Sequence, residues 1–127
     1  MPFHPVSLIL YTANNTVKKE NNVHFENGMS ESHIIKVSKD GASLKFSQAG
    51  SYRLELNGLI RMNGPVRVKL YNAKFSRDIN KFTEFTLNNN NINVSTILHL
   101  EKNHKISVIF SSDVTITELR FLINRVA

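Results

Sequence analysis

Apolar and polar residues alternate one by one in short segments along most of this chain. The clearest of these segments is GSYRLELN, at residues 50–57. Because successive side chains of a strand point to opposite faces, the alternation predicts a strand with one buried and one exposed face. The apolar face, which we expect in the core, holds Tyr52, Leu54 and Leu56. Gly50, just before them, suits a tight turn with positive φ.

Similar segments recur between turn residues such as Asp40-Gly41 and Asn63-Gly64-Pro65. They lie at residues 6–12, 34–37, 43–46, 66–71, 81–87, 94–100, 105–110 and 114–126. Residues 118–125 also suit a helix by propensity, but the alternation that leads into them favours a strand. Short strands at intervals of about 8–12 residues are typical of a β-sandwich or barrel. We therefore predict one all-β domain over residues 1–127, with polar connections at 14–27 and 88–91.

The amino-acid composition and the spacing of reactive residues argue against a catalytic, metal or cofactor site. The chain has no cysteine, which excludes disulfides and thiolate metal sites, and its five glycines form no phosphate-binding loop. The five histidines lack the spacing of a ligand pair, the acidic residues are spread singly, and no Gly-x-Ser-x-Gly motif occurs. We therefore expect no catalytic residue, no metal, no cofactor and no enzymatic activity.

The formal net charge is +6, and a basic surface favours anionic partners. Lys18 and Lys19 are the only adjacent basic pair, so the charges are scattered and ordinary solvation accounts for most of them. The apolar run Val6–Tyr11 is far shorter than the roughly 20 residues that span a bilayer. It also lacks the basic flank and cleavage site of a signal peptide, so we expect neither a membrane span nor a leader here.

Two motifs in order carry a resemblance to a known superfamily. Gly50 and Tyr52 match a Gly-x-Tyr-x-apolar strand. About 45 residues on, a second motif of alternating apolar residues around a turn is matched by Leu98, Leu100, Glu101, Lys102, Ile106 and Val108. Over residues 40–126 the chain resembles the tumour necrosis factor-like and complement-type globular-head superfamily. It departs at Asn103-His104, where that superfamily has Gly-Asp, but Asn tolerates the left-handed conformation that such a turn needs.

The resemblance implies a ten-stranded jelly-roll sandwich that assembles as a homotrimer, with one sheet facing the threefold axis. It places Leu98, Leu100, Ile106 and Val108 in the core with the residues of the first strand. On that strand's polar face, Arg53 and Glu55 become candidates for ion pairs between protomers. The terminal strand, taken as an edge strand with apolar residues on both faces, adds the interface candidates Leu119, Phe121, Leu122 and Ile123.

Three functional hypotheses follow. The first is a non-enzymatic trimeric recognition or surface-display module for a protein or glycan, located outside a cell or on a particle. Its contact loops would include Lys74, Arg77, Asn88, Asn89, Asn90 and Asn91. The second is a structural jelly-roll protein of a viral particle or spore coat. The third is a basic β-barrel that binds nucleic acid or another polyanion. Most strand aromatics are expected in the core, which argues against base stacking. Asn14 and Asn93 lie in formal glycosylation sequons, and their use stays open.

Overall fold

The computed structural model of this protein describes residues 7–30, 34–73 and 82–127, which form ten strands and no helix. The strands are β1 (Ser7–Val17), β2 (Glu26–Ser30), β3 (Ile35–Val37), β4 (Leu44–Phe46), β5 (Gly50–Arg61), β6 (Val66–Ala73), β7 (Phe82–Leu87), β8 (Asn91–Leu100), β9 (Lys105–Phe110) and β10 (Val114–Arg125). Among these residues there is accordingly no apolar helix of membrane-spanning length.

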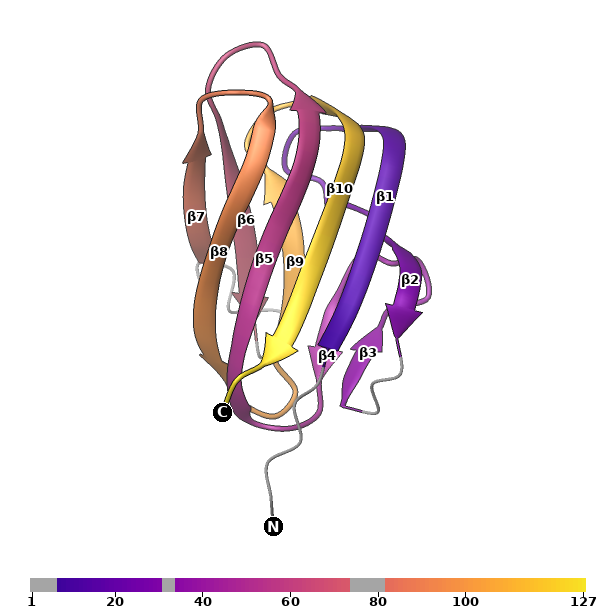
Figure 1. The fold of residues 1–127 in the computed structure, drawn as a ribbon, viewed down its shortest axis with the longest axis vertical. Helices are drawn as coiled ribbons and strands as arrows, with labels where there is room; N and C mark the ends of the chain where they lie inside the picture. Colours follow the sequence, from indigo (N-terminus) through magenta and orange to yellow (C-terminus); the bar gives the residue numbers. More distant parts are fainter. Residues whose placement is uncertain (1–6, 31–33, 74–81) are drawn as a thin grey trace.

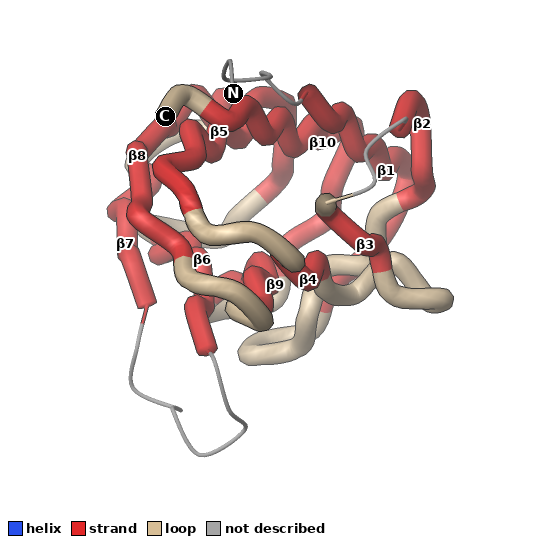
Figure 2. Tube along the Cα trace, turned by 90° about the horizontal axis from the view of Figure 1, so that it is seen from below, coloured by secondary structure: helices blue, strands red, loops and turns tan. Residues whose placement is uncertain are grey.

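The strands form two antiparallel sheets of five, in the orders β2–β1–β10–β5–β8 and β3–β4–β9–β6–β7. Figure 1 shows the first sheet in front of the second, and Figure 2 shows them as two layers. From β4 onwards, most strands that follow one another along the chain lie in opposite sheets, and β6 and β7 are the exception. This crossing between layers is that of a jelly roll, so the predicted all-β sandwich of about ten strands is confirmed.

The core lies between the sheets and consists of the inward-facing apolar side chains of both. Within it, the rings of Tyr52 and Phe46 make an edge-to-face contact with centroids 4.7 Å apart, and the Tyr52 hydroxyl donates to the carbonyl oxygen of Gln48 at 2.8 Å. Six of the seven predicted core residues are at most 1% exposed: Tyr52, Leu54, Leu56, Leu100, Ile106 and Val108. The seventh, Leu98, is half-buried against the core.

The position of β10 corrects one sequence-based prediction. This strand lies in the middle of its sheet, between β1 and β5, and is not an edge strand. Leu119, Phe121 and Ile123 are at most 1% exposed and belong to the core. The prediction that these three contact another protomer was therefore wrong, because the sandwich buries the longer apolar row of the strand. Of the four candidates on β10, Leu122 alone points away from the core, and it is half-buried.

Two stretches expected to be connections are strands. β2 covers part of the polar segment 14–27 and pairs with β1 at the edge of the first sheet, with a register shift between Ile9 and Leu10. β1 itself runs on to Val17 through Asn14, whose φ is +53°. Both stretches pair with a neighbouring strand through backbone hydrogen bonds, and their polar sequence carries no apolar alternation that would mark them.

The sequence predicted positive φ at two turn positions, Asn103 and Gly50, and the structure has it at one of them. Asn103 has a φ of +73°, which confirms the left-handed conformation predicted for the β8–β9 turn. Gly50 does not have the positive φ that we predicted. Among the described glycines, positive φ occurs at Gly41 and Gly64. A Cβ on Gly50 would instead lie 2.8 Å from Arg125 Nε and 2.9 Å from the carbonyl oxygen of Ala127. Glycine is needed there because the chain end approaches closely.

Candidate interaction face on the outer side of one sheet

The side of the β2–β1–β10–β5–β8 sheet that points away from the core is here called the outer face. On β5 the even-numbered residues are mostly buried, so Arg53, Glu55 and Asn57 belong to the outer face. The strand register sets their neighbours: Arg53 lies between Asn124 and Ile97, and Glu55 lies between Leu122 and Ser95. The polar side of the first sequence motif therefore faces outward, on the strand next to the edge strand β8.

Exposed apolar side chains gather on the outer face. Five large apolar residues are exposed in the part of the chain that the structure describes, and four of them lie here: Ile9, Tyr11, Leu59 and Ile97. Ile97, on the edge strand β8, is the most exposed at 54%. Ile9 is directly opposite the half-buried Leu122, so apolar side chains continue from β1 onto β10. Ile97 lies opposite Arg53 and Leu59 opposite Glu118, so exposed apolar residues alternate with charged ones across this face.

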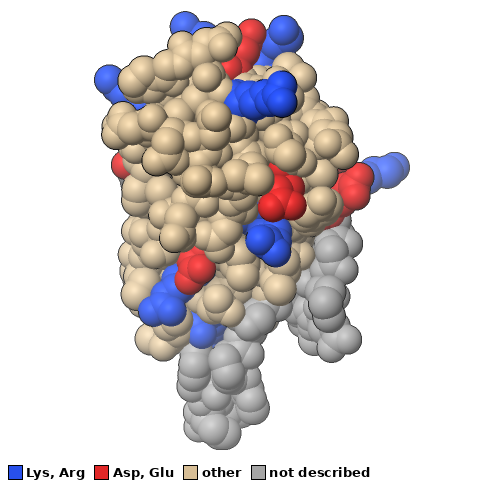
Figure 3. Space-filling model, turned by 45° about the horizontal axis from the view of Figure 1, so that its top comes forward, with Lys and Arg blue, Asp and Glu red and all other residues tan. Residues whose placement is uncertain are grey.

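Charged residues of both signs lie among them. β5 and β10 contribute three arginines and two glutamates to the outer face, namely Arg53, Glu55, Arg61, Glu118 and Arg120. Within the described residues, none of these five forms an ion pair, whereas Lys18–Asp113, Arg67–Glu84 and Lys69–Glu20 do so elsewhere. Figure 3, which brings the top of Figure 1 forward, shows acidic and basic side chains next to one another rather than in separate fields. A face of mixed sign offers charges of either sign to a partner surface.

Of the predicted contact loops, the structure describes the asparagine turn. Asn88, Asn89 and Asn90 form the exposed β7–β8 turn, and Asn91 begins β8 and donates its backbone N–H to Asn89 Oδ1 at 2.8 Å. With Met62, Gly64 and Pro65 of the β5–β6 turn, the three turn asparagines line a shallow hollow of about 270 Å³. Lys74 and Arg77 lie outside the described residues, but β6 ends and β7 begins at the other end of the sheet (Figure 1).

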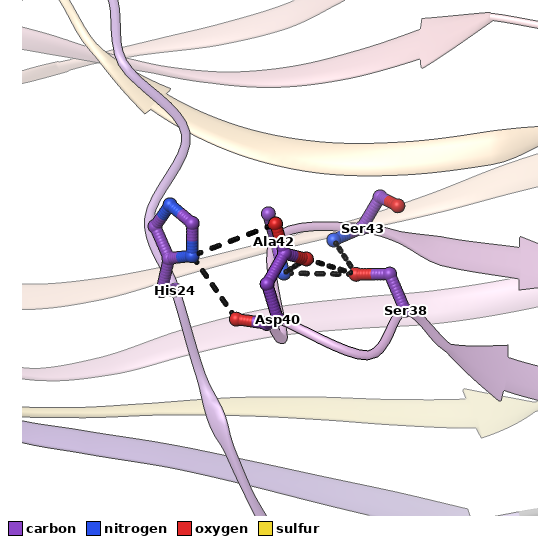
Figure 4. Close-up of polar contacts among 5 residues, drawn as sticks. All are labelled: His24, Ser38, Asp40, Ala42 and Ser43. Atoms are coloured by element: carbon purple, nitrogen blue, oxygen red, sulfur yellow. Dashed lines mark hydrogen bonds and ion pairs between the residues drawn. The ribbon is translucent and has the colours of Figure 1, made fainter.

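A serine, an aspartate and a histidine meet at the β3–β4 turn, as Figure 4 shows. Ser38 Oγ donates to Asp40 Oδ1 at 2.7 Å, and His24 Nδ1 lies 3.0 Å from the Asp40 carbonyl oxygen. Asp40 stands between the other two, so His24 is not placed to take a proton from Ser38 as a catalytic base would. Ser38 Oγ instead accepts the backbone N–H groups of Ala42 and Ser43.

The same contacts account for the electrostatics of this turn. The Ser38 hydroxyl, and then the Ala42 N–H, hold the pKa of Asp40 below its usual 3.8 by donating hydrogen bonds to its carboxylate. These hydrogen bonds therefore stabilise the β3–β4 turn. His104 has a comparable role in the β8–β9 turn, where its Nδ1 accepts the backbone N–H of Glu101 at 2.9 Å. Within the described residues, no group of three or more histidine or acidic side chains could hold a metal ion.

No protein-family model and no curated protein matches this sequence. Solved structures match the fold over nearly the whole chain. The Eiger TNF from S. frugiperda superposes with a TM-score of 0.73 at 10% identity, covering 96% of this chain and 94% of that one. Murine APRIL gives a TM-score of 0.71 at 9% identity, with 94% and 99% covered. The globular domain of zebrafish complement 1qA protein gives 0.70 at 10% identity, with 97% of each chain covered.

These matches establish the fold. The protein is a jelly roll of the kind found in tumour necrosis factor-like and complement-type globular heads, which confirms the resemblance drawn from the two sequence motifs.

Proposed function

We propose that this protein is a non-enzymatic recognition or surface-display module that assembles as a homotrimer through its outer face. One observation carries the proposal. The outer face combines four of the five exposed large apolar side chains with five charged residues that form no ion pair within the described part of the chain. The number of protomers comes from the resemblance to trimeric globular heads, in which one sheet faces the threefold axis.

The chemistry of the face suits contact between copies. Association buries Ile9, Tyr11, Leu59 and Ile97, and apolar burial is the main favourable contribution to such contacts. Arg53 and Glu55 can pair with residues of opposite sign on the neighbouring protomer. Burying such pairs costs about as much free energy as it returns, so they fix the register of the assembly more than they stabilise it.

The partner of the trimer is proposed to be a protein or a glycan bound by loops at the end of the sandwich. The asparagine turn at residues 88–90 supports this, because it is exposed and lines the hollow beside the β5–β6 turn. Loops held by a rigid sandwich are common positions for binding residues. Lys74 and Arg77 remain predicted contact residues, in the separate connection between β6 and β7.

A single charged substitution tests the assembly surface. Ile97→Glu places a carboxylate at the most exposed apolar position of the outer face. Because this position is exposed, the substitution should change the folding stability of the single protomer little. Thr86→Glu makes the same change in charge at an exposed position of β7, on the opposite sheet, and is the matched control. Light scattering should give a single-protomer mass for Ile97→Glu and the assembled mass for Thr86→Glu. Retained assembly in Ile97→Glu and in Tyr11→Glu would show that the outer face is not the contact.

A further inference from the structure

The second sheet brings three lysines into one row across its strands. Lys36 of β3 is directly opposite Lys45 of β4, and Lys45 is directly opposite Lys105 of β9. All three side chains are exposed, and their neighbours along each strand are largely buried, so they lie on the side of this sheet that points away from the core. We call Lys36, Lys45 and Lys105 the lysine row.

The lysine row is unfavourable for the isolated protein. Like charges directly opposite each other on neighbouring strands destabilise a sheet. Within the described residues, no carboxylate lies within ion-pair distance of any of the three ammonium groups, whereas Lys18 and Lys69 each have an acidic partner. Three cations on adjacent strands, with no acidic partner among the described residues, therefore leave a local positive field that an anionic ligand would relieve.

We propose that the lysine row binds a sulfated or otherwise acidic polysaccharide. Adjacent strands lie about 4.8 Å apart, so the row spans about 10 Å and can meet two or three successive anionic groups of a linear chain. Lysine suits this task because its ammonium is a point charge on a flexible stem and needs no fixed geometry. The inference goes beyond the proposed assembly, because the row is on the sheet opposite to the outer face.

The surroundings of the row favour a polysaccharide over other anionic partners. Single-stranded nucleic acid is bound with the help of exposed aromatic side chains on which bases stack. A membrane surface is bound with the help of apolar side chains that enter the lipid. Among the side chains that the structure describes, the five large exposed apolar residues all lie away from the row, with four on the outer face and Val126 after β10. Among the described side chains, closely spaced cations are left as the recognition feature.

The test compares two triple variants with the same change in charge. The row variant carries Lys36→Gln, Lys45→Gln and Lys105→Gln. The control carries Lys18→Gln, Lys19→Gln and Arg67→Gln, three exposed cations away from the row. Each variant lowers the formal net charge from +6 by three, to +3. The ligand is a short heparin-derived sulfated oligosaccharide, titrated by calorimetry at several salt concentrations against the full chain.

We expect the row variant to bind the oligosaccharide at least about tenfold more weakly than the unmodified protein. The affinity of the control should change by no more than a few-fold. The slope of log affinity against log salt should fall by about one for each lysine removed from the row. The row variant should also unfold at a temperature no lower than the unmodified protein, because a like-charge contact has been removed.

Three results would overturn the proposal: no binding by the unmodified protein, equal losses in both triple variants, or tighter binding to a single-stranded oligonucleotide or to anionic phospholipid vesicles than to the oligosaccharide. The short ligand reaches one row at a time. Its affinity therefore does not depend on the number of protomers, and a failure here is distinguishable from a failure of the proposed trimer.

Discussion

Tyr52 shows how a single residue of the first sequence motif holds the fold. Its ring is fully buried against Phe46, and its hydroxyl reaches the carbonyl oxygen of Gln48 in the β4–β5 turn. Burial raises the pKa of Tyr52 above its usual 10.0, because the charged phenolate loses solvation. The aromatic ring fills the core while the hydroxyl fixes the turn before β5.

Replacing Tyr52 by Phe should lower the free energy of unfolding by about 1 kcal/mol, the net contribution of one hydrogen bond. The raised pKa makes this contribution depend on pH. It is fully present below pH 10.0, the pKa in the unfolded chain, and is lost as pH rises through the higher folded pKa. Denaturant unfolding at neutral and at high pH should therefore show a difference between the two proteins that shrinks in alkali. A Phe variant as stable as the unmodified protein at neutral pH would remove the proposed role of the hydroxyl.

At the scale of the strand, β10 and β5 meet at an irregularity. The register of their pairing shifts between Ile116 and Glu118, so β10 contains one extra residue at this point. Gly58 of β5 lies against this bulge, and a Cβ built on it would overlap the carbonyl oxygen of Glu118 and come within 2.9 Å of Leu119 Cα. The bulge changes which residues of β10 face the core, from even-numbered before it to odd-numbered after it.

Gly58→Ala should therefore destabilise the protein by about 1–3 kcal/mol, because the added methyl group meets backbone atoms that cannot move without disturbing two strands. Equilibrium unfolding in denaturant measures the change. Thr86→Ala, at an exposed position of β7, is the comparison and should stay within about 0.5 kcal/mol. An unfolding free energy that Gly58→Ala leaves unchanged would mean that the bulge relaxes and does not set the register.

The elements also show what the sequence could predict and what it could not. Alternation identified the strand interiors, because the residues that alternate in GSYRLELN are those that the sandwich buries. It could not tell which side of β10 is inside, since both sides carry leucine. Nor could it find β2, whose strand conformation depends on pairing with β1. The lysine row was missed for a similar reason, because Lys105 is far from Lys36 and Lys45 in sequence and joins them only through the order of the strands.

At the scale of the molecule, the two outer surfaces of the sandwich differ in chemistry. The outer face of the first sheet is partly apolar and carries both signs of charge, which suits contact with a copy of itself. The second sheet carries the lysine row, which suits an anionic partner. Assembly through the first would leave the second accessible. Three rows on one trimer would then bind a long polyanion more tightly than one row, through their high effective concentration.

The measurement that tests assembly most directly is the absolute molar mass of the unmodified protein in solution, by light scattering after size-exclusion chromatography, at low and at moderate salt. We expect a mass near three times 14.5 kDa at both. A mass near 14.5 kDa at every concentration would contradict it, and the exposed apolar residues of the outer face would then need another partner. Larger, open-ended arrays would also contradict it, and would favour a structural protein of a particle or coat.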